Sequence, residues 1–334
     1  VTIVAGSVST NNSGTNPFTP TASGSQIGVD DLNTSLAGTS VIITTDDGTA
    51  TTEAGNVTLA SGVNIVKSGG VADTTLTIEA AGTIELNGTV TSTSGELNLV
   101  LTANDNSNTQ NDQNTASGDV VINAAITTNG GDFTSSGVGF DNNDGGSGTI
   151  TTGGGAVNIT HTGSINLDAE IDATSGNITI SGSEVLGNNN ITELSTSGSV
   201  GLTSTTQDLG GSGADDEIII ANSQNLTLDS TDSFYIETTA ELSDLDITVA
   251  PSTAGNQTYT LTGTNLTYTL SDSSSDVTTS LDNTGSTTAL NFSLNNSVQV
   301  VRLNAINVLT GEQSSLELLP NDVANINDSG RSAN

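Results

Sequence analysis

The chain lacks several residue types, and each absence excludes a class of chemistry. It contains no Cys, which excludes disulfides and thiolate sites. It has no Trp, 3 Tyr and 5 Phe among 334 residues, so a core built around large aromatic side chains is not expected. It also has no Met, not even at position 1, so we expect a processed or truncated segment from which a secretion signal has been removed.

Positive charge is almost absent as well. The 3 Lys and Arg side chains stand against 37 Asp and Glu side chains, which gives a formal net charge of −34. Nucleic acids and anionic membrane surfaces are recognised by clustered Lys and Arg, so we expect neither as a partner. No run of about 18 apolar residues occurs, so we expect no membrane insertion. The charge also makes copies of the chain repel one another unless cations, salt or strong backbone pairing hold them together.

The chain does contain many short segments in which Val, Ile and Leu alternate with Thr, Asn and Ser. Examples are NVTLA at 56–60, ELNLVL at 96–101 and NLTLD at 225–229. Alternation with a period of two residues predicts half-buried β-strands, and the Gly, Asn, Asp and Ser between them predict turns. No segment shows a sustained period of 3.6 residues, so we expect an all-β chain without helices.

A longer phrase recurs and indicates how these strands are arranged. Residues 84–97 read IELNGTVTSTSGEL, residues 120–133 read VVINAAITTNGGDF, and residues 165–178 read INLDAEIDATSGNI. Its second half recurs alone at 150–157 as ITTGGGAV. Self-similarity of this kind predicts a stack of similar coils, a parallel β-helix whose thin core holds Val, Ile and Leu. A set of β-sandwiches stays open as the alternative.

The spacing of the phrase predicts the length of a coil and the division of the chain. The first two copies lie 36 residues apart and the next two 45 apart, which coils of about 18 and about 22 residues would fill, with about 16 coils in all. We expect inserted loops at 104–117 and 140–148. Residues 1–35 are predicted to be a terminal strand, cap or linker, residues 36–200 the β-helix repeats, and residues 201–334 further coils or a small appended β-domain.

The repeated stretches resemble large secreted exoproteins of the filamentous haemagglutinin type. The resemblance covers roughly residues 75–200. It implies a right-handed parallel β-helix, an extracellular location, and a role in adhesion or in a surface fibre. The stretches that carry it are IELNGTVTSTSGELNLV, VVINAAITTNGGDF, TITTGGGAVNIT and SINLDAEIDATSGNITISG.

Oxygen-rich loops are the candidate metal sites. Ca²⁺ takes 6–8 oxygen ligands, which carboxylates and side-chain amides supply. The candidate side chains are Asp141, Asn142, Asn143 and Asp144 in one loop, and Asp215 and Asp216 in another. The spacing fits neither the EF-hand nor the repeat of Ca²⁺-binding β-rolls, so solvated polar loops are the alternative. Diffuse binding of cations by the acidic surface is a third reading.

We expect no catalytic site and no enzymatic activity. Neighbouring acids such as Asp46 and Asp47 point to opposite faces of a strand, so they do not form the paired carboxylates of a glycoside hydrolase. The single histidine, His161, is expected on the surface without a catalytic role.

One position of the phrase carries a side-chain amide or carboxylate. It is occupied by Asn87, Asn123 and Asp168. Two roles fit, and they are compatible: amides that stack between coils as a hydrogen-bonded ladder, or residues that favour the turn at this point.

These features together predict an extracellular structural protein, a β-solenoid segment of a cell-surface filament, sheath or adhesin. Neither end shows an amphipathic capping helix, so we expect the ends to be covered by copies of the chain, joined end to end, or by the rest of a longer surface polypeptide. Two alternatives stay open. One is a carbohydrate-binding or carbohydrate-cleaving β-helix of the spike or lyase type, with glycans as partners, and the other is a calcium-rich surface-layer protein of β-sandwiches.

Overall fold

The structure of the chain is a computed structural model. It describes residues 1–239 apart from 15, 47–53, 71, 106–117, 143–146, 189–190, 212–215, 224 and 231–233, and beyond 239 it describes the backbone of strands β27 to β34. The chain forms two compact units, residues 1–177 (unit 1) and 178–334 (unit 2). The fold is all-β, with parallel sheets stacked as a β-solenoid of about eight turns and almost no helix. The predicted fold class is therefore confirmed.

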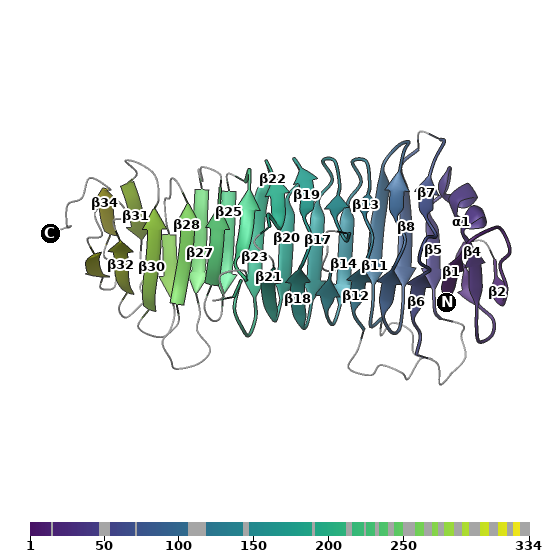
Figure 1. The fold of residues 1–334 in the computed structure, drawn as a ribbon, viewed down its shortest axis with the longest axis horizontal. Coiled ribbons are helices and arrows are strands. Elements are labelled where there is room, and N and C mark those ends of the chain that lie inside the picture. The colour runs from purple at the N-terminus through teal and green to yellow at the C-terminus, as the bar shows by residue number, and fades with distance from the viewer. Residues whose placement is uncertain are drawn as a thin grey trace. The chain divides into compact units, whose positions relative to one another are not determined.

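Unit 1 contains three parallel sheets, and each full turn adds one strand to each of them (Figure 1). In spatial order, the first sheet consists of β4 (Gln26–Gly28), β1 (Thr2–Val4), β6 (Val57–Leu59), β9 (Ile84–Leu86), β12 (Val120–Ile122), β15 (Phe140–Asp141) and β18 (Ser164–Leu167). The second consists of β7 (Ile65–Lys67), β10 (Val90–Ser92), β13 (Ile126–Thr127), β16 (Ile150–Thr151) and β19 (Ile171–Thr174). The third consists of β5 (Val41–Thr44), β8 (Thr74–Glu79), β11 (Leu97–Thr102), β14 (Phe133–Gly137) and β17 (Val157–His161). A hairpin of β2 (Asn12–Ser13) and β3 (Thr19–Pro20) and one helix, α1 (Val29–Leu36), complete the unit.

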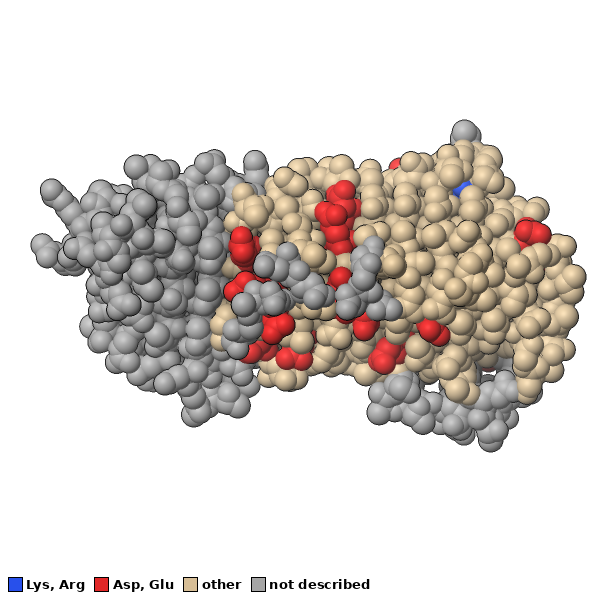
Figure 2. Space-filling view, in the orientation of Figure 1, with Lys and Arg blue, Asp and Glu red and all other residues tan. Residues whose placement is uncertain are grey.

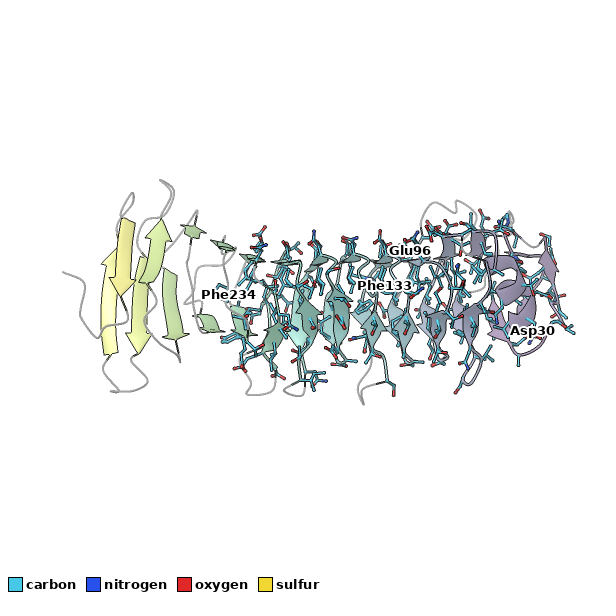
Figure 3. All side chains as sticks on the ribbon, turned by 90° about the horizontal axis from the view of Figure 1, so that it is seen from above. Asp30, Glu96, Phe133 and Phe234 are labelled. Carbon is cyan, nitrogen blue, oxygen red and sulfur yellow. The ribbon has the colours of Figure 1, made fainter. Side chains whose placement is uncertain are left out.

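The interior of unit 1 is a set of apolar columns that run from turn to turn. Ile84, Val120, Phe140 and Ile165 occupy equivalent positions in four successive turns, and each is at most 1 % exposed. Parallel strands stack about 4.8 Å apart, so aligned side chains remain in contact along the whole column. Figure 3 shows side chains filling the space between the sheets, with Phe133 among them. The alternation that predicted the strands thus also separates the buried face from the outer face.

The second Gly of the repeated phrase forms a tight corner in each turn. A Cβ atom added to Gly155 would lie 2.2 Å from the carbonyl oxygen of Gly131, and one added to Gly176 would lie 2.0 Å from that of Gly155. Only glycine lets successive turns approach this closely. The glycine recurs in the phrase because the turns stack directly on one another at this corner.

An inward hydroxyl group closes the same corner. Ser92, Thr128 and Thr152 each donate a hydrogen bond to the carbonyl oxygen of the Gly three residues later, at 2.7 Å for Ser92 and 2.6 Å for Thr152. All three side chains are buried, so the bond satisfies a hydroxyl group that water does not reach. In the next turn the position is taken by Ala173, which has no hydroxyl group.

Strand pairing corrects the predicted coil length. Ile84 of β9 pairs directly with Val120 of β12, so the 36-residue spacing is one turn rather than two. The predicted loop at 104–117 supplies the extra length, and residues 106–117 lie outside the described part of the chain. The 45-residue spacing does hold two turns, because β12 pairs with β15 and β15 with β18. The fold accordingly has about eight turns instead of 16.

The N-terminal end of unit 1 is closed by a helix, so the expectation that no amphipathic capping helix is present was wrong. Val29, Leu32 and Leu36 form the buried stripe of α1. Asn33 of α1 accepts a hydrogen bond through Oδ1 from the backbone N–H of Val66 in the edge strand β7, at 2.8 Å. The helix is eight residues long, which is shorter than the window in which a helical period stands out.

Backbone bridges close the other two edge strands at this end. Thr10 and Gln26 of β4 form an antiparallel bridge with N–H···O distances of 3.0 and 2.9 Å. The buried Phe18 forms a parallel bridge with Ile43 of β5. We call residues 1–44 the N-terminal cap; Figure 3 labels Asp30 of α1 within it. Because each sheet edge has its own cover, this end does not present an open row of backbone groups to another chain.

Unit 2 is also built from parallel strands, but its turns are less regular. One sheet has the order β22, β24, β26, β28, β30, β32, and another has β20, β23, β25, β27, β29. Among the described residues, β21 is continued by isolated bridges from Val185 to Leu209 and from Leu209 to Phe234. After β32 the pairing becomes antiparallel, with β33 on β32 and β34 on β31. The bounds are β20 (Ile178–Gly182), β21 (Glu184–Gly187), β22 (Leu194–Thr196), β23 (Ser199–Ser204), β24 (Ile218–Ala221), β25 (Asn225–Ser230), β26 (Phe234–Thr238), β27 (Asp244–Val249), β28 (Thr258–Gly263), β29 (Thr269–Asp272), β30 (Val277–Asn283), β31 (Ala289–Ser293), β32 (Val301–Ile306), β33 (Gln313–Leu318) and β34 (Val323–Asn327).

Candidate functional site

One residue of the first candidate Ca²⁺ loop belongs to the core, so the predicted metal role is wrong for it. Asn142 is fully buried beside the half-buried Asp141 of β15. Its Nδ2 donates to the carbonyl oxygen of Ala169 at 2.6 Å, and its Oδ1 accepts from the backbone N–H of Asp168 at 2.8 Å. Asn142 therefore joins two turns through both ends of its amide.

The other predicted metal ligands are not brought together by the described part of the chain. Asn143, Asp144 and Asp215 lie outside the described residues. Asp216 is exposed, and its backbone carbonyl accepts a hydrogen bond from Gly211 at 2.7 Å. Within the described ranges, no three His, Asp or Glu side chains are grouped closely enough to hold a metal ion.

The predicted amide ladder is confirmed for one step. Asn123 Nδ2 donates to Asn87 Oδ1 in the preceding turn, at 2.7 Å. Elsewhere Asn and Asp side chains accept hydrogen bonds from the backbone of the next turn, as Asn56 does from Thr83 at 2.9 Å and Asp132 from Ala156 at 2.7 Å. These side chains extend the hydrogen bonding between turns past the ends of the strands, which accounts for much of the Asn and Asp at the corners.

Two pairs of carboxylates in unit 1 were not predicted. Burial, and secondly the neighbouring Asp105, raises the pKa of Glu79. Burial, and secondly Asp172, raises the pKa of Glu170 in the same way. On the face of the molecule that Figure 2 shows, the described acidic side chains stand in separate groups with other residues between them. Two carboxylates attract a cation but supply fewer oxygen atoms than Ca²⁺ takes, so these pairs suit diffuse cation binding better than a defined site.

His161 lies in the core, which corrects its expected surface position. The ring is 4 % exposed, and its Nε2 lies 2.9 Å from the hydroxyl oxygen of Ser135, itself 1 % exposed. Burial lowers the pKa of His161 to about 4. A serine beside a histidine is the pattern of a nucleophile and its base, but a buried pair does not meet a substrate. This pair belongs to the packing of the interior.

Lys67 is also buried, although Lys is the residue type least expected in a core. It ends β7, is 0 % exposed, and its ammonium group donates a hydrogen bond to the carbonyl oxygen of Ser94 in the next turn. It is the one Lys or Arg whose side chain the structure describes. Lys67 therefore connects turns instead of facing a ligand.

The outward face of the second sheet presents hydroxyl groups in register. Thr91, Thr127 and Thr151 are aligned across three successive turns and are half-buried, and the next turn places Asp172 at this position. Hydroxyl groups both donate and accept hydrogen bonds but are neutral at ordinary pH. The arrangement suits contact with water or with another polar surface better than acid–base chemistry.

Sequence reasoning missed signals for three of these features. In VNITH, His161 stands two residues after Ile159 and four after Val157, both fully buried, so the alternation of the strand placed its ring inside. The helical stripe of α1 is present in VDDLNTSL at spacings of three and four residues, and Asp30 and Asp31 stand in its first turn, where acids are favourable. Lys67 likewise alternates with the buried Ile65 in β7, although the sequence does not show the Ser94 carbonyl that it meets in the next turn.

No helix among the described residues is long and apolar enough to cross a membrane.

The comparisons with known proteins do not identify the chain. No protein-family model matches the chain, and neither a curated protein nor a solved structure is significantly similar to it.

Proposed function

We propose that the chain is an exported structural protein, a β-solenoid segment of a cell-surface filament, sheath or adhesin. One observation carries the proposal: the same short phrase supplies core, corner and outer face in turn after turn of unit 1. A chain built this way produces length and repeated surface, which are what fibres and adhesive stalks need. The formal net charge of −34 suits an exposed, salt-rich location.

The N-terminal cap limits how copies would associate. We propose that contacts with copies of the chain, or with the rest of a longer surface polypeptide, use other surfaces than the capped end, because each sheet edge there already has a cover. In place of end-to-end joining through the capped end, this proposal has contacts along the outer faces or through the C-terminal part. The carboxylates would require cations at such contacts, and Ca²⁺ is the candidate.

The carbohydrate alternative loses support from the position of the aromatic rings. Sugars stack on exposed aromatic side chains, but Phe18, Phe133, Phe140 and Phe234 are all at most 1 % exposed. Tyr235 is half-buried, and the remaining aromatic side chains lie outside those the structure describes. A glycan array tests this alternative directly, and strong selective binding would reinstate it.

Two measurements test the proposal. Electron microscopy of the purified chain in Ca²⁺ or high salt should show laterally associated or filamentous assemblies, and dispersed monomers under every condition would contradict self-assembly. Antibody labelling of intact producing cells should detect the chain at the surface. Labelling only after the cells are opened would overturn the exported location, whatever the assembly state.

A further inference from the structure

His161 lies in the interior in contact with residues of the preceding turns. It is paired with Gly137 of the preceding turn. A Cβ atom added to Gly137 would lie 2.6 Å from the Gly118 carbonyl oxygen and 3.1 Å from Ala103 Cβ, and it would also lie 3.3 Å from His161 Cε1. The imidazole ring lies 5.6 Å from the ring of Phe140, at an angle of 55°. Ser135, the hydrogen-bond partner, stands in a column otherwise formed by Ile and Leu. The serine thus provides the polar contact of the ring, and the absence of a side chain at Gly137 leaves room for the ring as well as for the Gly118 carbonyl.

The ring is only partly satisfied there. Its Nε2 has Ser135, whereas its Nδ1 is buried with no hydrogen-bond partner in the described structure. A neutral imidazole tolerates this if Nδ1 is the unprotonated nitrogen, since one unmet acceptor is less costly than an unmet donor on a cation. An imidazolium would bury a positive charge with an N–H group that has no acceptor.

The described elements of unit 1 around the ring bring no inward carboxylate to it. β14 and β17 contain no acidic residue, and β11 contains none either. In β15, Asp141 alternates with the buried Phe140 and lies on the outer face. Asp119, on the corner before β12, accepts a hydrogen bond from the backbone N–H of Gly139 at 2.9 Å. Burial is the cause of the low pKa of His161, and no described carboxylate offsets it.

We propose that His161 makes the pairing of β14 with β17 an acid-sensitive point of the solenoid, at which uptake of one proton loosens the two strands while the turns nearer the N-terminal cap stay closed. Local opening is expected in a stack, because each turn contacts only its neighbours. This acid sensitivity is independent of the proposed function, because it rests only on the packing of His161 in the interior.

The direction of the pH effect follows from the two protonation states. In the closed turn the pKa of His161 is about 4, against an ordinary value of 6.5. Between these values the opened form holds a proton that the closed form lacks, so falling pH favours opening. Between pH 7 and pH 4 this makes opening roughly 100-fold more favourable, and the full factor of roughly 300 is reached only well below pH 4. Well below pH 4 both forms are protonated, and this contribution no longer changes.

The two carboxyl groups with raised pKa values, Glu79 and Glu170, have the opposite effect on stability as pH falls. The pKa values of Glu79 and Glu170 are raised by burial and by their acidic neighbours, so the closed form binds protons more readily and gains stability as pH falls. Neutralising part of a net charge of −34 also relieves repulsion within the chain. Mild acid should therefore tighten turns that lack a buried histidine, and only the His161 turn should loosen.

Hydrogen exchange of the whole chain, corrected for the intrinsic pH dependence, tests this turn by turn. Between pH 7 and pH 4.5 the amides of β14 and β17 should lose at least tenfold in protection, while those of β9 and β10 should keep or gain it. In His161→Gln, which keeps a polar side chain but does not titrate, the loss should vanish. Equal pH dependence in wild type and His161→Gln, or no local loss in wild type, would overturn the proposal.

A second measurement uses the wild-type chain and therefore does not depend on whether the variant folds. The chain has a single histidine, so one imidazole resonance reports its titration in the native protein. Its midpoint should lie below pH 5, or coincide with the opening of β14 and β17. A midpoint near pH 6.5 with the turn still protected would show that the ring accepts its proton in place, and the acid-sensitive turn would be ruled out.

Discussion

The N-terminal cap and the middle turns of unit 1 cover their strand edges in opposite ways. In the middle turns, each edge is covered by the next turn, so one phrase serves every sheet. In the cap, each edge has a cover of its own: Thr10 on β4, Phe18 on β5 and α1 beside β7. Repetition is enough to continue a stack, but ending one requires residues that do not repeat. The following four predictions test this difference, from the largest expected effect to the smallest.

Breaking the cap should have the largest effect. Leu32→Asp places a carboxylate at a fully buried position of α1, and burying an unpaired charge is strongly unfavourable. We expect a loss of about 4 kcal/mol or more in the free energy of unfolding, with aggregation through the exposed edges of β4, β5 and β7. Chemical unfolding and size-exclusion chromatography measure the two effects.

Val8→Asp is the matched control, because Val8 belongs to the same cap but is 69 % exposed. It should change stability by no more than about 0.5 kcal/mol. A monomeric Leu32→Asp variant with wild-type stability would show that the cap is dispensable and that the middle turns close on their own.

Disturbing the corner of a middle turn should come next. Gly155→Ala brings a Cβ atom within 2.2 Å of the Gly131 carbonyl oxygen, so the two turns must move apart, at a cost of about 2–3 kcal/mol. Gly201→Ala is the control, since a Cβ atom there has no neighbour within 4 Å, and it should be neutral or stabilising by about 0.5 kcal/mol. Thermal unfolding of both variants decides, and similar melting temperatures would argue against tight stacking at the corner.

Removing one corner hydroxyl should have a smaller effect than moving the backbone. Thr152→Val keeps the shape of the side chain but deletes its bond to the Gly155 carbonyl, with an expected loss of about 1–2 kcal/mol. The neighbouring Thr151→Val acts on the half-buried outer face and should stay within about 0.5 kcal/mol. If Thr151→Val proves the more harmful of the two, the corner bond is not what the inward hydroxyl contributes.

Adding the missing corner hydroxyl group should have the smallest effect on the free energy of unfolding, and this effect should be stabilising. Ala173→Ser restores a hydroxyl group where one turn lacks it, and a new bond to the Gly176 carbonyl would add about 0.5–1 kcal/mol. Ala169→Ser, equally buried in the same turn but away from the corner, should not stabilise. Stabilisation by neither serine would indicate that this corner has relaxed around alanine.

The regular part of the fold could be predicted from sequence because its signals are local. The alternation in IELNG and VVINA marks strands, and the recurrence of Gly95, Gly131 and Gly176 marks stacking corners. Coil length was less accessible, since a spacing of 36 residues equally fits two short turns or one turn with a loop. Only the pairing of Ile84 with Val120 distinguishes them.

The cap and the buried polar residues were harder to predict for a different reason. Asn33, Lys67 and His161 are each explained by a partner in another turn or in the cap, and sequence does not state those partners. The candidate Ca²⁺ residues failed in the same way at Asn142, whose amide is engaged by the next turn rather than by solvent. Residue type alone indicated a ligand, and the fold assigned a structural role.

The capped end gives the stack a starting point as well as a boundary. The cap residues precede the turns in chain order, and every turn of unit 1 pairs with one formed from residues shortly before it. A chain that folds from its N-terminal side would therefore add each new turn to the strand edges of the turn before it, in the register that the pairing fixes. Each completed turn would then cover the strand edges of the turn before it.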